Sequence, residues 1–183
     1  MNRALLYAVL ALAVWLLCGA SRWQRTSDTE KCADASVPGK ERIAACTRAI
    51  KSGELSPENL AITFNNRGIA RQNGGDYDRA IADYDEAILL DPELEQAYTN
   101  RGSAWDHKGQ YDRAITDYDE AIRLNPELAQ AYTNRGSAWY HKGDYDRAIA
   151  DQNEALRLDP QLAQAYTDRG IVNRSEFSGD SWV

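Results

Sequence analysis

Apolar and small side chains recur at helical spacing along residues 61–162, in segments that alternate between two patterns. In the first pattern, Tyr98, Gly102 and Trp105 lie at i, i+4 and i+7, which places them on one face of a helix. Gly109 follows as the expected end of that helix. The second pattern is a longer stripe made of Tyr111, Ala114, Ile115, Tyr118, Ala121 and Ile122. The chain therefore predicts pairs of amphipathic helices.

The pair of helices returns with an offset of 34 residues. Residues 97–105 recur unchanged at 131–139, and the segment 77–81 recurs at 111–115 and 145–149. A fixed period of this length indicates stacked repeats, because one pair is too small to bury its own apolar faces. The small residues Gly102 and Ala114 are expected to let paired helices approach closely, and Asn125-Pro126 to provide the N-cap and N1 residues of the next helix.

This spacing resembles the tetratricopeptide repeat family, which implies an all-α, right-handed superhelical solenoid of helix-turn-helix repeats. Three full units are expected at 61–94, 95–128 and 129–162. In the third unit Gln152 stands where the earlier units have Tyr84 and Tyr118, so we expect a weaker contact there. The second unit carries the resemblance through Tyr98, Gly102, Trp105, Ala114, Tyr118, Ala121 and Pro126.

The flanking segments have other expected roles. Residues 1–20 read as a signal peptide, because an apolar run at 4–17 follows Arg3 and ends in small residues. This predicts a periplasmic or secreted protein; the alternative is an uncleaved segment 4–20 that anchors it in the inner membrane. A flexible lead-in is expected at 21–40, a capping half-repeat at 41–60, a partial repeat or cap at 163–174, and a tail at 175–183. Ser56-Pro57 predicts the start of a helix over 57–73.

Cys32 and Cys46 are the two cysteines that remain after removal of such a signal. An even number of cysteines in an exported chain favours a disulfide, here one that joins the lead-in to the cap helix. The alternative is two unpaired thiols, with Cys46 as a small core residue.

The composition offers no catalytic chemistry. The net charge of −7 argues against a nucleic-acid surface, and no phosphate loop or nucleophile-base set is present. His107 and His141 occupy equivalent positions without a third recurring ligand. We therefore expect no enzyme activity, no cofactor and no metal.

One polar side chain per unit forms a row at equivalent positions: Asn66, Asn100, Asn134 and finally Asp168. In the family that the chain resembles, first helices line a concave groove, and this row is similar to the asparagine ladder of O-GlcNAc transferase repeat domains, whose amides grip an extended peptide. An amide offers both a donor and an acceptor to a peptide unit. The alternative is that each asparagine bonds only to the neighbouring helix. The other expected groove residues are Ile62, Asn65, Ile69, Gln96, Thr99, Ser103, Asp106, His107, Gln130, Thr133, Ser137, Tyr140 and His141.

Two further features concern charge. The family's carboxylate clamp is a set of five basic and amide residues, and only Asn100 matches it in this chain. Capture of an acidic C-terminal peptide is therefore not expected. The residues at the five clamp positions are Asn65, Ile69, Asn100, Gln130 and Asn134. A row of arginines at 67, 101, 135 and 169 is expected to pair with the recurring acids Asp83, Asp117 and Asp151.

These observations predict a non-catalytic scaffold that binds an extended segment of a protein or peptide partner, without nucleic acid. Membrane association is expected only if the N-terminal segment stays uncleaved. The alternative is a structural protein that assembles with itself, stacking through incompletely capped terminal repeats, with weak homo-oligomers as the visible species.

Overall fold

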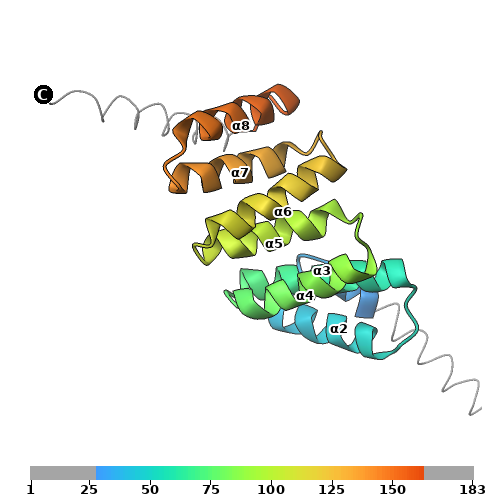
Figure 1. Cartoon of the computed structure of the whole chain (residues 1–183). Helices are drawn as coiled ribbons and strands as arrows, with labels where there is room; N and C mark the ends of the chain where they lie inside the picture. Colours follow the sequence, from blue (N-terminus) through green and yellow to red (C-terminus); the bar gives the residue numbers. More distant parts are fainter. Residues whose placement is uncertain (1–27, 163–183) are drawn as a thin grey trace, which may run out of the picture.

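The protein is a stack of α-helices. The computed structural model describes residues 28–162, and the regular elements within them are all helices. Figure 1 shows them following one another from α2 at one end of the stack to α8 at the other. The predicted all-α array of helix-turn-helix pairs is thus confirmed. Residues 28–33 are helical, and the helices after them are α2 (Gly39–Lys51), α3 (Pro57–Asn73), α4 (Tyr77–Leu90), α5 (Glu95–His107), α6 (Tyr111–Leu124), α7 (Ala129–His141) and α8 (Tyr145–Leu158).

Helices α3 and α4, α5 and α6, and α7 and α8 form the three pairs, and successive first helices also touch. The turn inside each pair is a glycine turn, as predicted. Gly109 has a φ of +70°, its N–H donates to the Asp106 carbonyl at 2.8 Å, and the N–H of Gln110 donates to the Trp105 carbonyl at 2.9 Å. This is the Schellman arrangement, which satisfies the last carbonyls of α5 and reverses the chain into α6.

The paired helices approach closely where the first helix has a glycine. A Cβ at Gly102 would lie 2.7 Å from the Tyr118 ring and 3.1 Å from the Ala114 carbonyl oxygen. The ring therefore sits directly against the backbone of α5, and Tyr118 is only 1% exposed. The prediction of a close approach at Gly102 and Ala114 is confirmed.

Trp105 joins the cores of neighbouring pairs. Its side chain packs against the cluster around Ile81 and Tyr84 in the first pair and against the cluster around Ile115 and Tyr118 in the second. A continuous apolar core of this kind is what lets units that are too small to fold alone stabilise one another.

Gln152 replaces the aromatic side chain in the third pair. It is fully buried against Gly136, and its Nε2 donates to the Thr133 carbonyl at 3.2 Å. Its Oε1 has no hydrogen-bond partner in the part of the chain that the structure describes. A buried amide with one unmet acceptor costs free energy, which agrees with the expected weaker contact.

The two predicted helix starts had different outcomes. Ser56 caps α3 as predicted: its hydroxyl accepts from the Asn59 N–H, and Pro57 is the first helical residue. The assignment of Asn125-Pro126 was wrong, because α7 begins only at Ala129. The Asn125 side chain instead accepts from the Glu127 N–H at 3.1 Å, which makes a local turn between the helices.

The N-terminal end of the described chain is packed against α2. The predicted flexible lead-in is corrected for residues 28–40, because residues 28–33 are helical and α2 already begins at Gly39. The Cys32–Cys46 disulfide is present, and both cysteines are buried. Arg48 pairs with the buried Asp28 at 2.6 Å, and the Arg42 Nε donates to the Cys32 carbonyl at 2.7 Å. The sequence separation of 14 residues corresponds to roughly 3 kcal/mol in the chain-entropy model.

Several sequence predictions lie outside the described residues: the signal or anchor at 1–20, the first part of the lead-in, the partial repeat at 163–174, the tail, Asp168 and Arg169. Within residues 28–162, no helix has the length and apolar character needed to cross a membrane.

The close approach at Gly102 leads to a first prediction. Gly102→Ala should lower the free energy of unfolding, because overpacking costs about 1–3 kcal/mol and exceeds the gain of about 1 kcal/mol from helix propensity. The measurement is urea denaturation followed by circular dichroism. Gly39→Ala is the matched control, since its Cβ would meet nothing closer than 3.9 Å. Equal midpoints for the two variants would show that the helices are not in tight contact at Gly102.

Candidate functional site

The first helices α3, α5 and α7 present the predicted asparagine row. Asn66, Asn100 and Asn134 are all partly exposed. The Asn100 Nδ2 donates to the Asn65 Oδ1 at 2.9 Å, and the Asn134 Oδ1 accepts from the Gln130 Nε2 at 2.7 Å. The Asn66 amide forms no hydrogen bond within residues 28–162. Asn100 thus holds two first helices together, whereas Asn66 and Asn134 make no contact with a neighbouring helix through their amides.

The residue before each of these asparagines is buried. Asn65, Thr99 and Thr133 are 7%, 8% and 1% exposed. The hydroxyls of the two threonines donate to carbonyls one turn earlier, at 3.0 Å for Thr99 and 3.1 Å for Thr133. Asn65, Thr99 and Thr133, which were predicted to line the groove, are thus buried, and little of each side chain is accessible to a partner.

Tyr140 lies at the C-terminal end of α7 and is partly buried. Its ring centroid is 5.7 Å from that of His141 and 5.5 Å from that of Tyr145. It therefore belongs to an aromatic group at the turn between α7 and α8. The fourth member of the row, Asp168, lies outside the described residues.

The arginine row is bound to carboxylates, as predicted. Each described arginine of the row donates at least two hydrogen bonds, of 2.7–3.2 Å, to an aspartate on the second helix of its own pair. The pairs are Arg67–Asp83, Arg101–Asp117 and Arg135–Asp151. Burial raises the pKa of the Asp117 carboxyl, although the Arg101 guanidinium acts in the opposite direction. These arginines are therefore structural and are not available to an acidic partner.

Two of the arginines also reach the preceding pair. Arg101 Nη1 lies 2.7 Å from Asp85, and Arg135 Nη1 lies 2.6 Å from Asp119. One guanidinium thus ties three helices together. Sequence reasoning missed Asp85 and Asp119, although their spacing is regular. Each lies 16 residues before its arginine, and the main acid of that arginine lies 16 residues after it.

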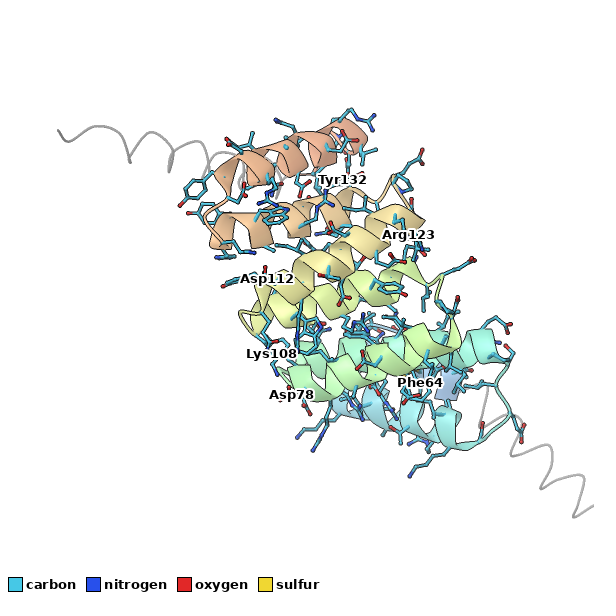
Figure 2. All side chains as sticks on the ribbon, in the orientation of Figure 1. Phe64, Asp78, Lys108, Asp112, Arg123 and Tyr132 are labelled. Carbon is cyan, nitrogen blue, oxygen red and sulfur yellow. A yellow bond between two sulfur atoms is a disulfide. The ribbon has the colours of Figure 1, made fainter. Side chains whose placement is uncertain are left out.

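A second set of contacts repeats along the turns of the stack. Tyr77 stacks on His107 at 5.1 Å, and Tyr111 stacks on His141 at 5.0 Å. Figure 2 shows Lys108 beside Asp78, with which it forms an ion pair, and Lys142 pairs with Asp112 in the same way. The two histidines therefore join neighbouring repeats, and within residues 28–162 no group of three side chains is arranged to hold a metal ion.

Cations also cover the tryptophans at these turns, with Arg113 4.6 Å from the centre of the Trp105 ring and Arg147 3.7 Å from the centre of the Trp139 ring. Such cation–π contacts stabilise the turn and give these two arginines a partner within the protein.

Gln72 and Asp106 occupy equivalent positions in successive units, but their side chains differ in their hydrogen bonds. The Gln72 Oε1 accepts from the Tyr84 hydroxyl at 2.9 Å, and its Nε2 donates to the Ser103 Oγ at 3.0 Å. The Asp106 Oδ1 is buried and finds no hydrogen-bond partner among residues 28–162. Burial raises the pKa of the Asp106 carboxyl, against the influence of His141 and His107. Asp106 is thus a partly buried acid that forms no ion pair within residues 28–162.

The arginine contacts generate a second prediction. Arg101→Met should lower the free energy of unfolding by about 3 kcal/mol, because it leaves the buried Asp117 carboxylate unpaired. Thermal and urea denaturation measure this loss. Arg123→Met is the control: Arg123 pairs with Glu120 on the surface, so its loss should change stability little. A similar effect for both variants would contradict the structural role of Arg101.

Comparisons with known proteins agree with this architecture. No curated protein matches the chain. Among solved structures, the first TPR domain of Spaghetti (RPAP3), bound to the HSP90 peptide SRMEEVD, is 26% identical with a TM-score of 0.64, over 66% of this chain and 95% of that one. The second TPR domain of human RPAP3, in complex with the HSP70 peptide SGPTIEEVD, is 30% identical with a TM-score of 0.62, over 64% and 98%.

A crystal structure of MamA protein has the same fold, with a TM-score of 0.71 at 23% identity, over 84% of this chain and 83% of that one. The family model of the tetratricopeptide repeat matches residues 65–127 and 106–163, which together span more than half of the chain. The chain therefore belongs to the tetratricopeptide repeat family.

Proposed function

We propose that this protein is a non-catalytic scaffold that holds an extended segment of a partner protein on the face formed by α3, α5 and α7. We call this the first-helix face and define it by Ile62, Asn66, Ile69, Gln96, Asn100, Ser103, Asp106, Gln130, Asn134 and Ser137. Two structural neighbours of the same family are complexes with short peptides, which supports a peptide as the kind of partner. Scaffolds of this family are typically non-catalytic.

The observation that carries the proposal is the repetition of accessible amides along this face. Asn66 and Asn134 are partly exposed at equivalent positions, and Gln96 and Gln130 are exposed. Each amide has both a donor and an acceptor, which matches the N–H and C=O of an extended main chain. Repetition of one amide per unit suits a ligand whose main chain also repeats, and such recognition depends little on the ligand's side chains.

The face does not suit the acidic C-terminal peptides of the two RPAP3 complexes. Those peptides end in Glu-Glu-Val-Asp. At the corresponding clamp positions this chain has only neutral residues, with Ile69 and Gln130 among them. The arginines of the first helices do not compensate, because they are paired with Asp83, Asp117 and Asp151. We therefore propose a partner segment of a different composition.

We also propose that the protein is exported. The apolar run at 4–17 has the composition of a signal sequence, and the Cys32–Cys46 disulfide suits an oxidising compartment. A third prediction follows for protein recovered from cells and alkylated without reduction: a mass that begins at Ser21, with no alkylated thiol. A mass that begins at Met1 would favour a retained anchor, and alkylated Cys32 and Cys46 would contradict export to an oxidising compartment.

A fourth prediction tests the binding face. A phage-displayed library of random nonapeptides, selected on the wild-type protein, should yield binders, and binding of the synthesised peptides should be lost in the double variant Asn66→Ala with Asn134→Ala. Both residues can lose their amides without breaking a contact between helices, so the melting temperature should stay close to the wild-type value. Fluorescence anisotropy of labelled peptides measures the affinity.

The control is the double variant Glu86→Ala with Thr116→Ala, which truncates two exposed side chains on second helices. Failure to select any peptide, or undiminished binding by the asparagine variant, would contradict the proposed face. In that case sedimentation at increasing protein concentration would test the alternative of self-assembly, which requires a mass that grows with concentration.

A further inference from the structure

We propose that the partner segment carries a basic side chain, lysine or arginine, that pairs with Asp106 on the first-helix face. This inference rests on the proposed function and adds the chemistry of the ligand to it.

The first argument is the state of the Asp106 carboxylate. Its Oδ1 is buried without a hydrogen-bond partner among residues 28–162, whereas Gln72, at the equivalent position of the preceding unit, satisfies both ends of its amide. An unmet acceptor that carries a charge is costly, because water is excluded and nothing in the described chain replaces it. The other oxygen, Oδ2, is not among the buried atoms and makes no hydrogen bond among residues 28–162, so it is the atom that a positively charged N–H donor of a partner could reach.

The second argument is that the nearby cations have other partners. Lys108 pairs with Asp78, Lys142 with Asp112, and Arg101 with Asp85 and Asp117. Arg113 lies over the Trp105 ring. The basic side chains that act on the Asp106 charge are His141 and His107, and both are engaged in stacking on tyrosines. Asp106 therefore has no arginine or lysine counterion in the described chain.

The third argument is the charge of the face as a whole. Asp106 is the one charged residue among the ten that define the first-helix face, and the full chain has a net charge of −7. A single acid on an otherwise neutral surface sets the sign of the local potential, and the acidic chain reinforces it at longer range. Charge complementarity of this kind selects among partners more than it adds affinity. It favours a basic segment and disfavours an acidic one.

The position of Asp106 also suits an extended ligand. It lies on the middle first helix, α5, six residues after Asn100, and His141 on the next first helix, α7, acts on its charge. Six residues span about 9 Å along a helix, so a main chain held by the amides near Asn100 would need a long side chain, such as that of lysine or arginine, to reach Asp106. The amides would bind the main chain, and Asp106 would select one side chain.

The test begins with the peptide selection on the wild-type protein and repeats it on Asp106→Asn and on Glu86→Gln. Asp106→Asn preserves the shape of the side chain and removes its charge, whereas Glu86→Gln removes one charge from the surface of α4. Peptides selected by the wild type and by Glu86→Gln should be enriched in lysine and arginine and depleted in aspartate and glutamate. The Asp106→Asn selection should lose this preference.

A double-mutant cycle then measures the pairing directly. One selected peptide is synthesised with its lysine and with methionine in its place, and both forms are titrated against the wild type and Asp106→Asn. The exchange should weaken binding to the wild type by about tenfold or more and leave binding to the variant nearly unchanged. Asp106→Asn should also melt at or above the wild-type temperature, because it removes a buried charge that the free protein leaves unpaired.

Each outcome has a distinct meaning. If no peptide binds the wild-type protein, the proposed function fails and the inference fails with it. If peptides bind without enrichment of basic residues, or if the lysine exchange weakens binding equally in wild type and variant, the inference is overturned while the proposed function stands. A drop in melting temperature with uniform loss of all peptides would show that Asp106 has a structural role instead.

Discussion

The close approach of the two helices in each pair is the constraint on which the rest of this structure depends. Gly102 lets the Tyr118 ring lie against the backbone of α5, and the ring is then excluded from water. The pair becomes a unit with an apolar edge on each side, and Trp105 spans the boundary to the previous unit. Stacking therefore follows from the shape of a single pair, and the repeat period carries it along the chain.

Polar contacts between repeats follow the same period as the helix pairs. Each of Arg101 and Arg135 bridges its own pair and the preceding one, while Lys108 and Lys142 join the turns through Asp78 and Asp112. The arginines of α5 and α7 and the lysines at the turns are thereby engaged in contacts that hold the stack together. The first-helix face carries amides, hydroxyls and the two isoleucines Ile62 and Ile69, and Asp106 is its one charged residue.

Sequence reasoning succeeded where a local rule decides the outcome. Ser56 and Pro57 began a helix and Gly109 ended one, because capping depends on the few residues around each terminus. It failed at Asn125, whose side chain can cap a helix or form a turn with nearly equal local preference. The helical lead-in was also missed, because the order of residues 28–33 comes from the disulfide and from the Asp28–Arg48 pair rather than from an apolar pattern.

By itself the sequence determined the helix pairs, their period, their close contact at glycine and the pairing of the arginine row. These follow from residue size and spacing, which are the same in every copy of the repeat. Only the tertiary structure decided which polar side chains of the first helices stay accessible. Thr99 and Asn100 are neighbours in the chain, yet stacking buries the first and leaves the second partly exposed. The physical reason is that a helix turns its residues by about 100° each, so accessibility depends on where the next repeat packs.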